Sequence, residues 1–146
     1  DVVSAHQIKL QADLEFSEAD FSDADVLFLP GGMPGTRNLA AHEGLCGELL
    51  KADKAGKRLA AICAGPSVLG GLGILEGRKA TCYPGFEGEL KGAEYTRQGV
   101  VTDGNVTTAR GLGYALDLGI ELLALLTDRE HAGQIKDSIQ YDQIPM

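Results

Sequence analysis

The residues best suited to chemistry in this sequence surround Cys63. A short apolar run, Leu59 to Ile62, ends at this cysteine, and Ala64-Gly65-Pro66-Ser67 follows it. Proline suits the first turn of a helix, so the pattern predicts a strand that turns sharply into a helix at Cys63. The thiol would lie beside unpaired backbone N–H groups, which favour the nucleophilic thiolate. The alternative is a buried structural cysteine, because free cysteine is among the most buried residue types.

A second segment could bring backbone donors to the same place. Asp25 to Leu29 is an apolar run that ends at Pro30-Gly31-Gly32, and such a run is typical of a central parallel strand covered on both faces. If this strand neighbours the one that ends at Cys63, the N–H groups of Gly32 and Ala64 could form an oxyanion hole. Glycine allows a ligand to approach the backbone closely. The alternative is that Pro-Gly-Gly is only a turn.

The remaining pattern predicts strands alternating with helices. Further strands are expected over 2–10 and 79–83, with a polar surface connection over 11–25 and a hairpin over 100–108 around Asp103-Gly104. Helices are expected over about 36–54, 66–75, 114–126 and 128–139. This alternation indicates an α/β sandwich with a mostly parallel sheet, in which ligands bind beyond the carboxyl ends of the strands.

Composition limits the classes of function. The chain has 146 residues with a net charge of −8, which suggests one domain and argues against nucleic-acid binding. It contains no apolar run of transmembrane length and no signal pattern. The cysteines, Cys46, Cys63 and Cys82, have unrelated spacings that indicate neither a disulfide framework nor a zinc site, so a reducing cytoplasm is expected. No metal or organic cofactor is expected either.

The two chemical segments resemble the ThiJ/PfpI superfamily, and its deglycase branch in particular. The resemblance rests on Leu29-Pro30-Gly31-Gly32, on Ala60 to Pro66 and on a later strand-to-helix segment, Thr107 to Gly113. It implies a flavodoxin-like fold, a three-layer α/β sandwich of the class I glutamine amidotransferase type, and a homodimer. It also implies that Cys63 is a reactive, oxidisable nucleophile with the N–H groups of Gly32 and Ala64 around it.

The same resemblance implies further residues around the site. Gly31 would lie beside the nucleophile, and His6 and Arg110 would lie near the mouth, where the family can bind small anions. Tyr83 could hydrogen-bond in the site, although packing is the alternative role. The alternatives for His6 and Arg110 are a strand-surface histidine and a salt bridge at a subunit interface. Cys82 is either a resolving partner for Cys63 or a passive thiol.

The chain departs from the family pattern in two respects. The family's N-terminal strand and helix, which carry a glutamate that hydrogen-bonds the nucleophile, have no counterpart before Asp1. We therefore expect residues 1–146 to be a single domain that is incomplete at its N-terminus, with the absent segment as a separate piece. Ala64 and Tyr83 stand where branches of the family place a histidine, so a Cys/His/Asp triad is not evident.

These observations lead to one preferred function and two alternatives. The preferred function is that of a cysteine-dependent glyoxalase or deglycase acting on small reactive carbonyls or glycated protein adducts. The first alternative is a redox-sensing stress protein or chaperone in which Cys63 is oxidised. The second is an intracellular cysteine peptidase or amidase, against which the lack of a histidine after Cys63 counts. The expected partners are a carbonyl substrate or glycated protein and a second copy of the chain, not nucleic acid or a membrane.

Overall fold

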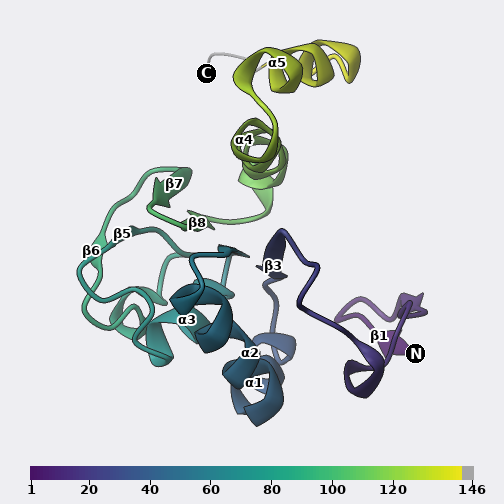
Figure 1. Cartoon of the computed structure of the whole chain (residues 1–146), viewed down its shortest axis with the longest axis vertical. Coiled ribbons are helices and arrows are strands. Elements are labelled where there is room, and N and C mark those ends of the chain that lie inside the picture. Colours follow the sequence, from purple (N-terminus) through teal and green to yellow (C-terminus); the bar gives the residue numbers. More distant parts are fainter. Residues whose placement is uncertain (143–146) are drawn as a thin grey trace.

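The computed structural model describes residues 1–142, and a four-stranded sheet lies at its centre (Figure 1). The strand order is β3-β4-β8-β7. The strands are β3 (Val26–Leu29), β4 (Arg58–Ile62), β7 (Val100–Asp103) and β8 (Val106–Ala109). β3, β4 and β8 are parallel, whereas β7 runs antiparallel to β8. Gly104 turns the chain between β7 and β8 at a φ of 59°, which confirms the hairpin expected around Asp103-Gly104.

β3 lies at an edge of this sheet, so its expected central position is wrong for the described chain. Among residues 1–142, β3 pairs with β4 alone. Leu27 and Leu29 are buried, but Phe28 is 49% exposed. The strand is therefore covered on one face and partly open on the other, because successive side chains of a strand point to opposite faces.

Helices cover both faces of the sheet (Figure 1). One face carries α1 (Gly35–Ala41), α2 (Glu43–Lys54) and α3 (Pro66–Gly71), and the other carries α4 (Ala115–Leu126), on which α5 (Arg129–Ser138) packs. α4 and α5 occur where they were expected, with Asp128 capping α5 by accepting a hydrogen bond from the His131 N–H at 2.7 Å. α3 ends at Gly71, earlier than the expected Leu75.

The helix expected over 36–54 is two helices that meet at His42. This residue has extended backbone angles, φ −85° and ψ 96°, and its Nδ1 accepts a hydrogen bond from the Leu45 N–H at 3.0 Å. The imidazole thus caps α2, and its ring lies 4.4 Å from that of Phe16. A side chain that satisfies a free N–H at this point lets the chain begin a new helix instead of continuing the old one.

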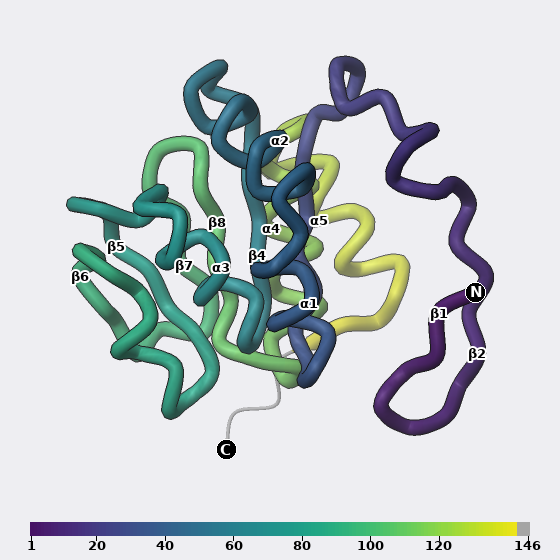
Figure 2. The backbone as a smooth tube through the Cα atoms, turned by 90° about the horizontal axis from the view of Figure 1, so that it is seen from below, coloured from purple at the N-terminus to yellow at the C-terminus, as the bar shows by residue number. Residues whose placement is uncertain are grey.

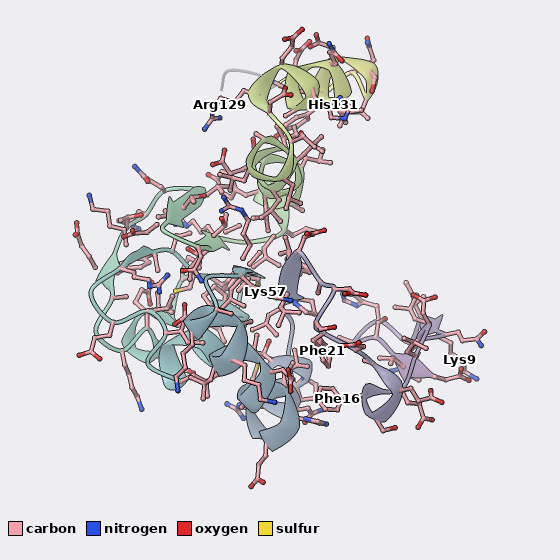
Figure 3. The ribbon with its side chains drawn as sticks, viewed as in Figure 1. Lys9, Phe16, Phe21, Lys57, Arg129 and His131 are labelled. Carbon is pink, nitrogen blue, oxygen red and sulfur yellow. The ribbon has the colours of Figure 1, made fainter. Side chains whose placement is uncertain are left out.

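Residues 1–25 form an extension beside β3 (Figure 2). In place of one strand over 2–10, β1 (Val2–Val3) and β2 (Lys9–Leu10) form a short antiparallel hairpin. The Ser4 hydroxyl accepts hydrogen bonds from the N–H groups of His6 and Ile8, which holds the turn. The connection over 11–25 contains a 3-10 turn, η1 (Phe16–Glu18). Lys57 anchors its end by donating to the Phe21 carbonyl at 3.0 Å (Figure 3).

A smaller parallel pair lies beyond β7. It consists of β5 (Lys79–Ala80) and β6 (Glu94–Tyr95), so the strand expected over 79–83 is only two residues long. Two further 3-10 turns, η2 (Glu87–Glu89) and η3 (Leu112–Tyr114), complete the described elements. No helix among residues 1–142 has the length and apolar character needed to span a bilayer.

The core is divided between the two faces of β4. Leu59 and Ala61 belong to the larger cluster, packed with residues of α2 and α3. Ile62 belongs to a smaller cluster with Ala109 and Leu118 of α4. Side chains in β4 alternate, so residues 58, 60 and 62 face α4. The last residue on that face is followed directly by Cys63.

Candidate active site

Cys63 lies at a sharp turn between β4 and α3. Its φ is 63°, a left-handed conformation that is uncommon for a residue with a side chain. Two backbone hydrogen bonds of 2.9 Å hold it there: the Cys63 N–H donates to the Ala109 carbonyl, and the Cys63 carbonyl accepts from the Tyr83 N–H. Such a conformation costs about 1–3 kcal/mol and persists only where surrounding structure enforces it. The thiol is partly buried and is not in a disulfide.

Two glycines let the neighbouring backbone approach this turn. A Cβ at Gly31 would lie 2.5 Å from the Cys63 Cβ, closer than two carbon atoms can pack. A Cβ at Gly65 would lie 2.8 Å from the Leu29 carbonyl oxygen. The end of β3 and the start of α3 can therefore meet only because both positions lack a side chain.

Backbone donors beside the thiol are uncommitted. The structure gives no hydrogen bond from the N–H of Gly32 or Ala64 to any of residues 1–142. The Ala64 nitrogen lies 3.2 Å from the point where a Gly31 Cβ would be, so it adjoins the Gly31-Gly32 segment. Gly32 has a φ of 91°, and its Cβ position meets no atom within 4 Å. Free N–H groups next to a nucleophile can bind a developing oxyanion.

The hydroxyls of Thr36 and Ser67 bind the carbonyls of the same two residues, Gly32 and Ala64, and sequence reasoning missed both. Thr36 Oγ1 donates to the Gly32 carbonyl at 2.8 Å, and Ser67 Oγ donates to the Ala64 carbonyl at 2.7 Å. Both side chains are buried. Their spacing, three or four residues after the carbonyl that they bind, is typical of serine and threonine in a first helical turn, and this signal could have identified them.

Tyr83 and Arg110 lie next to Cys63. Tyr83 is hydrogen-bonded to the Cys63 carbonyl through its own N–H, and its side chain is half exposed. Its ring adjoins Gly111, where an added Cβ would lie 3.4 Å from a ring carbon. Arg110 follows β8 as Cys63 follows β4, and Ile62 and Ala109 are register partners. The two residues therefore sit side by side at the carboxyl edge of the sheet.

The structure does not bring His6 to the thiol within this chain. It lies in the exposed turn between β1 and β2, in the hairpin that projects from the body (Figure 2). The other histidines have different places: His42 caps α2, and His131 lies on α5 (Figure 3). No histidine is therefore near Cys63, because these three are all that the sequence contains.

Cys82 is a buried thiol with little tendency to ionise. Burial, followed by the nearby Glu87 carboxylate, raises the pKa of Cys82 from 9.0 to about 11. A thiol attacks a sulfenic acid or disulfide as thiolate, so this environment makes Cys82 a poor resolving partner for Cys63.

The thiol of Cys63 is only partly accessible. A hollow of about 330 Å³ is lined by Met33, Thr36 and Ser67, which flank the turn, but Cys63 does not line it. Among residues 1–142, no group of three or more His, Cys, Asp or Glu side chains is arranged to hold a metal ion. The carboxyl edge of the sheet therefore brings together a thiol, two backbone N–H groups without a hydrogen-bond partner among residues 1–142, and the backbone of Arg110.

Known proteins are similar to this chain along most of its length. The Arabidopsis thaliana protein DJ-1 homolog B is 34% identical over 136 residues, which are 92% of this chain and 31% of that protein. The Drosophila melanogaster protein dj-1beta is 31% identical over 137 residues, 92% of this chain and 73% of that protein. The deglycase PfpI of Pyrococcus furiosus is 34% identical over 114 residues, 77% of this chain and 68% of that protein. The chain thus spans about a third of the plant relative's length.

The solved structures that resemble this chain include DJ-1 proteins. A DJ-1 superfamily protein of Salmonella typhimurium, crystallised as a cysteine-to-alanine mutant, matches 97% of this chain and 78% of its own at a TM-score of 0.91 and 34% identity. Drosophila melanogaster DJ-1beta matches 97% of this chain and 77% of its own, also at 0.91, with 26% identity. The DJ-1/PfpI family pattern itself covers residues 1–125. With its flavodoxin-like fold and the family pattern spanning both glycine-flanked strand ends, the chain belongs to the DJ-1/PfpI family.

Proposed function

We propose that this protein is a cysteine-dependent glyoxalase or deglycase that acts on small reactive carbonyls such as methylglyoxal or on their protein adducts. The observation that carries the proposal is the left-handed Cys63 at the end of β4, pressed against Gly31 and flanked by the free N–H groups of Gly32 and Ala64. Relatives named deglycases, at 33–34% identity, support a carbonyl substrate.

The proposed reaction begins with addition of the Cys63 thiolate to the aldehyde carbon. A carbon–sulfur bond forms, the carbonyl π bond breaks, and the new oxyanion is stabilised by the Gly32 and Ala64 N–H groups before it takes a proton. The proton on the former aldehyde carbon then moves to the neighbouring carbonyl carbon and leaves a thioester, and water releases lactate and the free thiol. The net reaction, methylglyoxal plus water to lactate, needs no oxidant and no metal. A general acid–base group must carry the protons between these positions.

The experiment is lactate formation from methylglyoxal by the full-length protein. Cys63→Ala should abolish turnover, and Cys46→Ala is the matched control because Cys46 lies on α2 and hydrogen-bonds carbonyls of α1. Full activity in Cys63→Ala would refute the proposal.

A second candidate, a redox sensor or chaperone, is favoured by the contrast between Cys63 and Cys82. Cys63 is partly accessible, whereas Cys82 is buried with its pKa raised to about 11. Peroxide should therefore convert Cys63 to sulfinate without a Cys63–Cys82 disulfide. Intact-mass analysis with peptide mapping tests this, and oxidation of Cys46 or Cys82 ahead of Cys63 would contradict it. A peptidase is the weakest candidate, because no histidine lies beside Cys63.

We also propose that the working protein is a cytoplasmic homodimer built as a three-layer sandwich. The partial accessibility of Cys63 and the exposed Leu112, 87% accessible in the turn after Arg110, support a second copy at the mouth of the site. Light scattering coupled to size exclusion measures the oligomeric state directly, and a monomer at all working concentrations would rule the dimer out.

A further inference from the structure

Each of the two residues whose N–H groups face no partner is held at its carbonyl by one residue of the helix that follows. The Gly32 carbonyl accepts two hydrogen bonds from Thr36, one from the N–H at 2.9 Å and one from Oγ1 at 2.8 Å. The Ala64 carbonyl accepts two from Ser67 in the same way, from the N–H at 3.0 Å and from Oγ at 2.7 Å. The same two-bond anchor therefore occurs at both strand ends beside Cys63.

The two anchors occupy equivalent places in the fold. Thr36 is the second residue of α1, and Ser67 is the second residue of α3. Each helix follows one of the neighbouring parallel strands β3 and β4, and α1 packs against α3. Both residues line the same hollow of about 330 Å³. Two segments far apart in the sequence thus bring their hydroxyls to one region, next to the turn that holds Cys63.

Both hydroxyl side chains are shielded from water. Thr36 is 2% exposed and Ser67 is 8% exposed. Water therefore has little access to replace either hydroxyl as a donor, and a carbonyl that loses its hydroxyl partner keeps only the backbone bond. Removing a hydroxyl should loosen the anchor without unmaking the first turn of the helix.

The direction of the Gly32 N–H depends on such an anchor because side-chain packing does not fix it. Gly32 is exposed at a φ of 91°, and its Cβ position meets no atom within 4 Å. Glycine is also the residue with the greatest backbone freedom. The N–H and the carbonyl of one residue are joined through two soft torsions, so a carbonyl bonded to a helix limits how far the N–H can swing. The same holds for Ala64, which follows the left-handed Cys63.

We propose that Thr36 and Ser67 are a matched pair of positioning residues, which hold the Gly32 and Ala64 N–H groups toward the oxygen that becomes negative when the Cys63 thiolate adds to a carbonyl. In that step the carbon–sulfur bond forms, the π electrons of the carbonyl move to the oxygen, and the oxygen takes a proton afterwards. Donors stabilise the oxygen best when they are aimed before the charge appears, and supporting hydrogen bonds supply that aim. The pair rests on the proposed function, to which it adds the groups that prepare the oxyanion site.

The test measures two reactions of the full-length protein: lactate formation from methylglyoxal, and alkylation of Cys63 by iodoacetamide followed by peptide mapping. Thr36→Val and Ser67→Ala should each lower kcat about tenfold, less than the loss of a whole oxyanion donor, and leave KM within about twofold of wild type. The alkylation rate should also stay within about twofold, because displacement of iodide by the thiolate places no negative charge on an oxygen. Thr36→Ser keeps the hydroxyl and should recover most of the wild-type kcat.

Thr127→Val and Ser138→Ala are the matched controls. Thr127 Oγ1 donates to the Leu123 carbonyl at 2.7 Å, four residues back, and Ser138 Oγ donates to the Ile135 carbonyl at 2.8 Å, three residues back. These are the same kinds of hydroxyl bond as those of Thr36 and Ser67, but they lie at the ends of α4 and α5. Both controls should keep the wild-type kcat, and a comparable loss in either would overturn the pair.

Two further outcomes would overturn the pair. One is a wild-type kcat in both Thr36→Val and Ser67→Ala, and the other is an alkylation rate that falls in proportion to kcat, because the hydroxyls would then act on the thiol or on folding.

A wild type that forms no lactate would refute the proposed function instead. The pair is then judged by how well methylglyoxal protects Cys63 from iodoacetamide, since the reversible adduct also places its oxygen at the Gly32 and Ala64 N–H groups. Clearly weaker protection in Thr36→Val and Ser67→Ala would support the pair. Protection equal to that of wild type, or no protection of wild type, would overturn it.

Discussion

The two ends of the parallel strands β3, β4 and β8 use hydrogen bonds in opposite ways. At the amino end, three polar side chains are hydrogen-bonded to one another. Arg78 donates to Asp53 at 2.9 Å and to Asn105 at 2.5 Å, and Asn105 donates to Asp53 at 3.1 Å. Asn105 also donates to the Lys57 carbonyl at 2.9 Å. At the carboxyl end, the N–H groups of Gly32 and Ala64 have no hydrogen-bond partner within residues 1–142.

This difference places stabilising hydrogen bonds at the amino end of the strands and the candidate chemistry at their carboxyl end. The amino-end network joins the end of α2, the start of β4 and the turn before β8, and its polar groups bond one another. The carboxyl end holds Cys63 in a strained conformation and keeps donors unsatisfied. A site can hold strain and free donors only if the rest of the fold over-determines its geometry. Four changes test that separation, from the largest expected effect to the smallest.

Replacing Cys63 should cause the largest loss of activity, and replacing it with glycine should also raise the free energy of unfolding. Cys63→Ala removes the proposed nucleophile, so methylglyoxal turnover should fall by about 10³-fold or more. Cys63→Gly should lose as much activity but raise the free energy of unfolding by about 1 kcal/mol, because glycine adopts a φ of 63° without a Cβ penalty. Denaturant titration checks the stability, and a less stable Cys63→Gly would mean that the turn is not strained.

Gly31→Ala should disrupt the carboxyl end of the strands through a steric clash with Cys63. The new Cβ would lie 2.5 Å from the Cys63 Cβ, so β3 and the turn must separate, at a cost of about 1–3 kcal/mol. Alkylation of Cys63 by iodoacetamide should change rate as its surroundings shift.

Gly32→Ala is the matched control for Gly31→Ala. Its Cβ meets no atom within 4 Å, so the only cost is the φ of 91°. A larger alkylation change in Gly32→Ala than in Gly31→Ala would contradict the assigned contact.

Asn105→Ala should weaken the amino end without altering the thiol. It removes hydrogen bonds to Asp53, Arg78 and Lys57, which are partly buried, and should cost about 1–3 kcal/mol of unfolding free energy. The alkylation rate of Cys63, measured under native conditions, should stay within twofold of wild type. A tenfold change would show that the two ends are coupled and that the separation fails.

The smallest effect should be a loss of stability at high pH that depends on Cys82. Its pKa is raised from 9.0 to about 11 in the folded chain, so the unfolded thiol ionises first as the pH rises. The stabilising contribution is complete below about pH 9 and is lost as the pH rises toward 11. Thermal unfolding should therefore show a steeper alkaline decline in wild type than in Cys82→Ala, and equal slopes would count against the raised pKa.

Local sequence patterns predicted much of the fold. The Asp103-Gly104 turn, the apolar run into Cys63, the proline that opens α3 and the Asp128 cap of α5 each depend on neighbouring residues alone. The errors came where distant contacts decide. The break at His42 depends on a ring contact with Phe16 and a cap to Leu45, and the hairpin over 2–10 depends on the Ser4 hydroxyl. The edge position of β3 depends on which strands are present to pair with it.

The sequence by itself determined the candidate nucleophile and the glycines around it, because a strand end, a thiol, a small residue and a proline form a local signal. Only the tertiary structure decided that Gly31 approaches Cys63, that the Gly32 and Ala64 N–H groups have no hydrogen-bond partner among residues 1–142, and that His6 lies elsewhere. These are relations between segments far apart in the chain. They depend on strand order and register, which local periodicity does not encode.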